Sequence, residues 1–279
     1  MVENGAMVDN GAKTRVRLIG LPTDSHSSFL RGAAAAPTAI RAALSSDHAN
    51  MASESGLEIG TDVRLEDAGD LPLDESARDI DQIREAAAEA MSDGAVPIFL
   101  GGDHMVTYPI VAGIVAERGP LNILHFDAHP DLYEEFGGDP LSHASPFARI
   151  MENKLASRLV QVGIRTANAH CRNQAARFGV ETIAMRDFAP ERVPIPDGPL
   201  YISIDMDALD PAFAPGVSHH EPGGLSVRDI LSVLDRVTGP LIGADIVEYN
   251  PARDINGMTA VVAAKLVKEI AALAARGNT

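Results

Sequence analysis

The sequence predicts an α/β protein in three layers, with helices on both faces of a mostly parallel central sheet. From residue 14 onward, short runs of β-branched and apolar residues alternate with longer alanine-rich segments of helical periodicity. This alternation is typical of a sheet built from strand–helix–strand units. Because no internal repeat or low-complexity linker interrupts it, we expect one domain over residues 14–279, preceded by a flexible polar tail over residues 1–13.

The alternation predicts where each element lies. Strands are expected at residues 15–20, 63–68, 96–100, 121–126, 158–162, 199–205 and 240–247. Helices are expected at residues 36–44, 76–91, 105–117, 145–154, 167–178, 226–237 and 257–275. Capping residues mark two of the helix starts, namely Ser76 and the box from Ser226 to Asp229, whose side chains can satisfy free backbone N–H groups.

Charge and composition exclude several classes of protein. Lys and Arg total 23 against 39 Asp and Glu, so the formal net charge is −16. Nucleic-acid phosphates and anionic lipids would repel such a chain, so we expect neither nucleic acid nor a membrane as a partner. No apolar run reaches the ~18 residues that suggest a membrane span. A single cysteine, Cys171, excludes an internal disulfide framework, and the start of the chain lacks a secretory signal, so the expected location is the cytoplasm.

Residues that can bind metals follow three of the predicted strands, at the carboxyl end of each. They form the sequences Gly101-Gly102-Asp103-His104, Asp127-Ala128-His129-Pro130-Asp131 and Asp205-Met206-Asp207. Residues two apart on an extended chain project to the same side, so the side chains within each sequence can converge. Each sequence alone also occurs as an ordinary turn or helix cap. Their conjunction at the carboxyl ends of parallel strands, where open α/β sheets bind ligands, predicts a site.

Together these sequences would bring four carboxylates and two imidazoles to one edge of the sheet. Carboxylates that close cannot all ionise unless cations lie between them. Oxygen-rich ligation without cysteine favours a hard divalent ion such as Mn²⁺ over a structural zinc. Two such ions roughly 3.5–4 Å apart can share a hydroxide at neutral pH, which predicts metal-assisted hydrolysis. Phosphoester cleavage would use a similar pair of ions, so this chemistry alone leaves the substrate open.

Longer motifs around these residues resemble those of the ureohydrolase family, which contains the arginases and agmatinases. The matching stretches occur in the family's order and read GGDH (101–104), FDAHPD (126–131), SIDMDALDP (203–211), EPGG (221–224) and DIVEYNP (245–251). The resemblance extends from about residue 15 to the C-terminus. It implies the arginase-like three-layer fold and, by analogy with the family, a homo-oligomer of three or six copies.

The resemblance also implies two Mn²⁺ ions, and the family's ligand positions can be matched one by one to residues of this sequence. One ion would be held by His104, Asp127, Asp131 and Asp205, and the other by Asp127, His129, Asp205 and Asp207. A hydroxide bridging the two ions would attack the guanidinium carbon of a small guanidino substrate.

Three residues receive catalytic roles from the same resemblance. Asp131 would relay a proton to the leaving amine. Glu248 would pair with the guanidinium, whose donors suit the two oxygens of a carboxylate. His143, in the sequence LSHASPF (141–147), would act as an acid–base or shuttle group near the mouth of the site.

Residues around the motifs bear on the choice of substrate. Tyr133 stands where arginases carry an asparagine that helps to hold the amino-acid head group, so we expect an agmatinase-like member that hydrolyses agmatine or a similar ω-guanidino amine to urea and the amine. Glu134 is a candidate to attract the distal ammonium, and its alternative is a solvated acidic turn. His219 replaces a small hydroxyl residue that lines the pocket in the family. The sequence of the 25–32 loop also differs from the one usual in agmatinases.

Several alternatives remain open at this point. Arginase itself, or a guanidino-acid hydrolase of the guanidinobutyrase type, would use the same metal ligands. A single-zinc deacylase on a related fold is less favoured, because His104, Asp131 and Asp207 supply a further metal site. A catalytically inactive binding or regulatory subunit should have lost ligands, yet all six positions are filled. His125, just before the motif, is expected to pack into the sheet.

Overall fold

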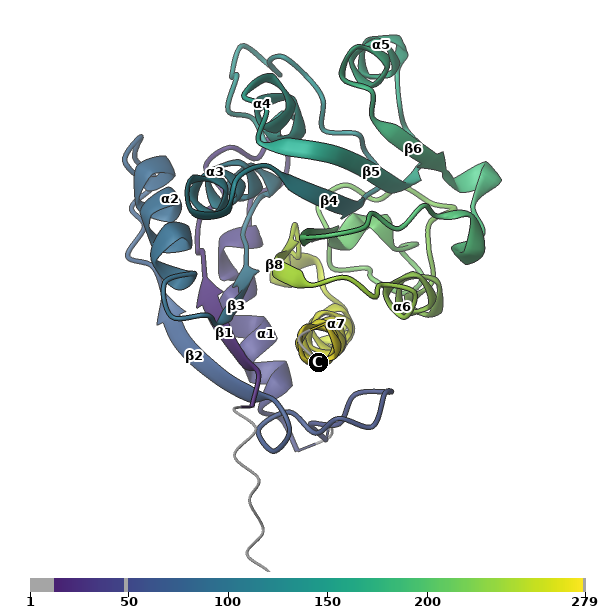
Figure 1. Ribbon diagram of the computed structural model, residues 1–279. Coiled ribbons are helices and arrows are strands. Elements are labelled where there is room, and N and C mark those ends of the chain that lie inside the picture. Colours follow the sequence, from purple (N-terminus) through teal and green to yellow (C-terminus); the bar gives the residue numbers. More distant parts are fainter. Residues whose placement is uncertain (1–12, 48–49, 278–279) are drawn as a thin grey trace, which may run out of the picture.

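The computed structural model describes residues 13–47 and 50–277, and its centre is an eight-stranded sheet in which every paired strand is parallel (Figure 1). The order of the strands across the sheet is β2-β1-β3-β8-β7-β4-β5-β6. Their bounds are β1 Arg15–Gly20, β2 Arg64–Asp70, β3 Val96–Leu100, β4 Leu121–Phe126, β5 Ala156–Ile164, β6 Glu181–Ala184, β7 Leu200–Asp205 and β8 Leu241–Val247.

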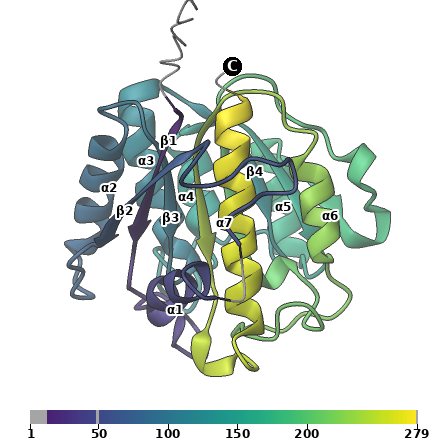
Figure 2. The ribbon, with the colours of Figure 1, turned by 90° about the horizontal axis from the view of Figure 1, so that it is seen from below.

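Helices cover both faces of the sheet, which confirms the predicted three-layer α/β fold (Figure 1). One face packs against α1 (Ala36–Leu44), α6 (Val227–Leu234) and α7 (Met258–Arg276), and α7 runs along it (Figure 2). The other face packs against α2 (Asp79–Ala90), α3 (Thr107–Arg118), α4 (Pro146–Glu152) and α5 (Ala169–Phe178). Within the described part of the chain, no helix is both long and apolar enough to span a membrane.

Short 3₁₀ helices follow several strands and loops. Their bounds are η1 Ala33–Ala35, η2 His104–Val106, η3 Met185–Asp187, η4 Pro190–Arg192, η5 Met206–Ala208 and η6 Pro251–Arg253. Two of them follow central strands: η5 begins directly after β7, and η2 begins after the three residues 101–103 that follow β3. They turn the chain sharply, so the polar residues that follow those strands stay at the carboxyl edge of the sheet.

The middle of the sheet is buried and apolar, as expected for parallel strands covered on both faces. Every residue of β3 and β7 is buried. The chain leaves β3 and places β4 three positions away, and β7 and β8 later fill the gap between them. The carboxyl ends of β3, β8, β7 and β4 therefore lie side by side where the strand order reverses, which is the usual place for a ligand site in such sheets.

The observed elements differ from the predicted ones in a few places. The predicted boundaries agree with the observed ones to within about three residues. The edge strand β6 was not predicted, because its four residues are mostly half-exposed and carry no apolar alternation. Predictions for residues 1–13 fall outside the described residues, apart from residue 13.

The two predicted helix caps have opposite outcomes. Ser76 does not cap α2, which begins at Asp79; the carboxylate of Asp79 instead accepts hydrogen bonds from the backbone of Asp74 and Glu75. The prediction for Ser76 was wrong because its hydroxyl accepts from Arg78 N at 3.3 Å, in the turn that precedes the helix. The capping box at α6 is confirmed: Ser226 Oγ accepts from Asp229 N at 3.1 Å, and the Asp229 carboxylate accepts from Ser226 N at 2.9 Å.

Removing the α6 cap provides a test of this local structure. Ser226→Ala removes the side-chain oxygen that accepts from the amide of Asp229, so we expect the free energy of unfolding to fall by about 1 kcal/mol in urea titrations. Ser232→Ala, in the same helix, removes only a hydroxyl that donates back to the carbonyl of Arg228, and should change stability little. Equal losses in both variants would contradict the capping role.

Candidate metal centre

A glycine turn holds the carboxyl ends of the central strands together. A Cβ atom on Gly102 would lie 1.6 Å from the carbonyl oxygen of Thr23, so only glycine fits there. The Thr23 carbonyl accepts from Asp103 N at 3.1 Å, and the Gly102 carbonyl accepts from Glu248 N at 2.8 Å. These bonds join the segments that follow β1, β3 and β8, and they place His104 and Glu248 beside each other.

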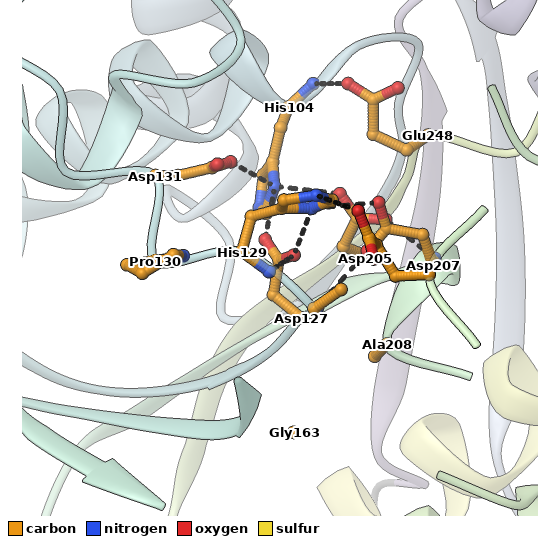
Figure 3. A network of polar contacts seen from close by, with 12 residues as sticks. His104, Asp127, His129, Pro130, Asp131, Gly163, Asp205, Asp207, Ala208 and Glu248 are labelled. Carbon is orange, nitrogen blue, oxygen red and sulfur yellow. Dashed lines mark hydrogen bonds and ion pairs between the residues drawn. The ribbon is translucent and has the colours of Figure 1, made fainter. Parts of the chain in front are cut away.

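All six predicted ligand side chains meet at this edge of the sheet and point toward one another (Figure 3). Two imidazole nitrogens stand among carboxylate oxygens. His104 Nδ1 lies 3.0 Å from Asp131, 3.1 Å from Asp205 and 3.3 Å from Asp127. His129 Nδ1 lies 3.1 Å from Asp207 and 3.4 Å from Asp127. Asp127 therefore faces both imidazoles.

The chemistry of this cluster fits metal ions. His104 Nδ1 is fully buried, and no group among the described residues makes a hydrogen bond with it although three carboxylate oxygens surround it. Burial and the neighbouring carboxylates of Asp207 and Asp127 raise the pKa of Asp205 well above its usual range. An unsatisfied ligand nitrogen and mutually repelling carboxylates are both satisfied when cations lie between them. The cluster therefore contains histidine and aspartate groups that could hold a metal ion.

A buried chain of hydrogen bonds orients His104 from behind. Its Nε2 lies 3.0 Å from Ser203 Oγ, and that hydroxyl donates to Asp245 Oδ1 at 2.7 Å. Because Ser203 gives its own proton to Asp245, Nε2 is the nitrogen that donates, which leaves Nδ1 free to bind a metal. The second oxygen, Asp245 Oδ2, accepts from Tyr201 at 2.6 Å and Thr107 at 2.9 Å.

His125 plays a similar part for a bridging carboxylate. It is fully buried in the sheet, as expected from the sequence. Its Nδ1 lies 3.1 Å from Gln161 Nε2, an amide donor, so Nε2 carries the proton and donates to Asp127 Oδ2 at 2.8 Å. Burial lowers the pKa of His125, so it acts here as a neutral donor. The sequence interpretation missed this contact, although the period of two places His125 on the same side as Asp127.

A pocket of about 190 Å³ opens beside the cluster. It is lined by Ser28, His129, Pro130, Asp131, Tyr133, Phe136, His143, Ala144, Thr166, Asp205, Asp207, His219 and Glu248. The two remaining predicted ligands, His104 and Asp127, are fully buried next to it. A small cationic molecule in this pocket would meet the carboxylates of Asp131, Asp205, Asp207 and Glu248 in its lining.

Glu248 and His143 form a pair at the pocket wall. Glu248 Oε1 accepts from His104 N at 2.9 Å and lies 3.1 Å from His143 Nδ1, while His143 Nε2 lies 2.8 Å from Ser28 Oγ. Although burial opposes it, the Glu248 carboxylate raises the pKa of His143 to about 9. The backbone of Glu248 has φ of 61°, and Asp131 has 49°. Such left-handed conformations in residues other than glycine gather at functional sites.

Of the four predicted substrate contacts, Glu248, Tyr133 and His219 line the pocket, and Glu134 does not. Tyr133 accepts a hydrogen bond from Asn168 at 2.6 Å, and its ring stacks on His170. The ring of His219 stacks on His143 with centroids 5.2 Å apart. Glu134 is more than half exposed and forms an ion pair with Arg177 at 3.0 Å, so it does not reach the pocket. The alternative of a solvated acidic turn fits it better.

Breaking the hydrogen-bond chain behind His104 should weaken metal binding. Ser203→Ala removes the acceptor for His104 Nε2, and loss of such a partner typically costs about 10–100-fold in metal affinity. Tyr201→Phe is the matched control, because it removes a bond to the other oxygen of Asp245 and leaves the Ser203 link intact. We expect calorimetric titration with Mn²⁺ to show weaker binding in the first variant only. Equal affinities in both would contradict this role of Ser203.

Comparisons with known proteins agree with the site. The model of the Arginase family matches residues 14–272. The mitochondrial arginase 1 of Arabidopsis thaliana is 48% identical over 94% of this chain and 82% of its own length. The mitochondrial agmatinase of Gallus gallus is 34% identical over 90% and 78%. An arginase structure from Medicago truncatula superimposes with a TM-score of 0.89 at 45% identity, covering 95% of this chain and 88% of that one.

These comparisons favour arginase, one of the alternatives left open by the sequence, over the agmatinase-like assignment that Tyr133 suggested. A single aromatic side chain in place of an asparagine was weak evidence, since it is outweighed by identity spread over nearly the whole chain. With its metal-binding cluster, its fold and a family match over almost its full length, the chain belongs to the arginase family of hydrolases, which act on guanidino C–N bonds.

Proposed function

We propose that this protein hydrolyses the guanidino group of L-arginine to urea and L-ornithine with two Mn²⁺ ions. The observation that carries the proposal is the difference in similarity: 48% identity to a plant arginase against 34% to an agmatinase, over comparable shares of the chain. The location of Glu248 in the pocket wall beside the metal-binding cluster supports a guanidinium substrate, because a carboxylate can accept two of its N–H donors.

Two ions account for the ligand arrangement better than one. The oxygens around His104 Nδ1 and those around His129 Nδ1 form two groups that share Asp127. His104, Asp127, Asp131 and Asp205 would hold one ion, and Asp127, His129, Asp205 and Asp207 the other. Manganese is proposed from the ligand set, since four carboxylates and two imidazoles without thiolate favour a hard ion.

In the proposed reaction, substrate orientation and proton transfer would be carried out by different residues. When bound, the ions would supply an activated water at neutral pH. Glu248 would pair with the guanidinium and turn its carbon toward the cluster. As the C–N bond breaks, Asp131 would pass a proton taken from the attacking water to the leaving amine, so that urea and a neutral amine separate. His143, held between Glu248 and Ser28, would carry to solvent the proton that the next water loses when it is activated.

The substrate is tested by urea release from four guanidino compounds with added Mn²⁺. We expect kcat/KM to be highest for L-arginine, about ten-fold or more above agmatine, 4-guanidinobutyrate and 3-guanidinopropionate. A site that binds both the α-amino and the α-carboxylate group is left with unpaired polar groups by a substrate that lacks one of them. Agmatine as the best substrate would restore the agmatinase-like assignment. Hydrolysis of none, with metal bound, would support an inactive subunit.

The guanidinium contact is tested separately at Glu248. Glu248→Gln keeps the shape of the side chain and removes its charge, so we expect kcat/KM for L-arginine to fall by about 10–100-fold with unchanged metal content. The control is the double variant Glu134→Gln, Glu135→Gln, which removes two charges at the exposed turn that lies outside the pocket. Comparable losses in both would show that the overall acidity, and not a specific contact, attracts the substrate.

A further inference from the structure

Arg165 follows β5 and has its guanidinium enclosed by backbone carbonyl groups. Nε donates to the carbonyl of Glu221 at 2.8 Å. The two terminal nitrogens donate to Gly163 at 3.2 Å, Asp207 at 2.6 Å, Ala208 at 3.1 Å and Leu209 at 3.3 Å. One side chain therefore joins three segments that are far apart in the sequence: the end of β5, the turn after β7 and the loop at residue 221.

Two of these segments flank one imidazole of the metal centre. Asp207 Oδ2 lies 3.1 Å from His129 Nδ1, on the side where a metal would bind. A carboxylate oxygen of Glu221 lies 3.9 Å from His129 Nε2, on the opposite side. Arg165 holds the main-chain carbonyls of both acidic residues, so the position of its guanidinium sets how they approach His129. Figure 3 shows Gly163 and Ala208, whose carbonyl groups both accept a hydrogen bond from Arg165, on the side of the cluster where Asp127 and Asp207 lie.

The surroundings of Arg165 are built to admit its planar head group. A Cβ atom on Gly224 would lie 2.7 Å from Arg165 Nη2, so glycine makes room for the guanidinium. The same turn is tied from the other side, where the Asp210 carboxylate accepts from Gly223 N at 2.6 Å and Gly224 N at 3.1 Å. A lysine carries the same charge but has no fork of fixed N–H groups, so it cannot bridge three segments at once.

The other half of the centre depends on different groups. His104 is oriented by Ser203 and Asp245, neither of which contacts Arg165 in the hydrogen bonds of the described residues. The two imidazoles of the cluster are therefore positioned by separate networks. A disturbance of one network should affect one ion more than the other.

We propose that Arg165 is the positioning residue for the half of the metal centre formed by His129 and Asp207. It acts through the main chain of Asp207 and Glu221 and contacts neither substrate nor metal. This inference rests on the two-ion centre of the proposed function. It states that Arg165 controls how tightly, and in what ligand geometry, one of the two ions is bound.

The test is the variant Arg165→Lys, with Arg172→Lys as its matched control. Arg172 lines the same surface hollow as Arg165 but donates to a single carbonyl, that of Ala167 at 2.6 Å. Metal-free protein is titrated with Mn²⁺ by calorimetry, and with Co²⁺ while its visible absorption is recorded. We expect Arg165→Lys to bind the first ion as the unaltered chain does and the second at least about ten-fold more weakly, with a changed Co²⁺ spectrum for that ion only. Arg172→Lys should bind both ions normally.

Other outcomes overturn the proposal in distinguishable ways. If Arg165→Lys binds both ions with unchanged affinity, or loses both equally, Arg165 has no selective role at His129. Arg165→Gln repeats the comparison if the lysine variant does not fold, and failure of both to unfold cooperatively would make Arg165 a requirement of the fold instead. A single ion bound by the unaltered chain would contradict the two-ion centre itself, whatever the variants do.

Discussion

The electrostatic repulsion among Asp127, Asp131, Asp205 and Asp207 is the constraint on which the rest of this structure depends. These carboxylates converge at the ends of buried strands, where water is scarce and like charges interact strongly. Hydrogen bonds from the backbone relieve part of the repulsion, for example from Asp207 N to Asp205 at 2.7 Å. The remainder calls for cations. Two Mn²⁺ ions would change the formal charge of the protein from −16 to −12, and this change of four charges would fall entirely within the cluster.

Such a cluster must be held in place before any ion arrives, and the surrounding fold does this in three ways. Gly102 permits a close approach that joins the ends of β1, β3 and β8. Ser203 and Asp245 orient His104 from within the sheet, and Arg165 holds the turn that carries Asp207. Each device fixes the backbone or side chain of a ligand through protein contacts, so the ligand geometry does not depend on the metal alone.

The sequence predicted most of the fold and which residues would gather in the metal-binding cluster, because both follow simple periodicities. Strands and helices alternate at a pitch that implies a parallel sheet, and Asp127, His129 and Asp131 recur at the strand period of two. What it missed depends on contacts between distant segments. The residues next to Arg165 in the sequence do not distinguish it from a surface arginine. The role of Asp245, a single polar residue in an apolar strand, depends on its contact with Ser203 of a neighbouring strand. The sequence left Glu134 open between a substrate contact and a solvated acidic turn for the same reason, since its partner Arg177 lies on a distant helix.

Substrate preference was the hardest property to predict, because it depends on a few side chains at the pocket mouth, whereas the metal centre depends on the architecture of the whole sheet. The central claim concerns that centre and is tested most directly by anomalous diffraction at the manganese edge from crystals grown with Mn²⁺. The account predicts two peaks in each chain, one beside His104 Nδ1 and one beside His129 Nδ1, with Asp127 reaching both. A single peak, or peaks away from these imidazoles, would contradict it.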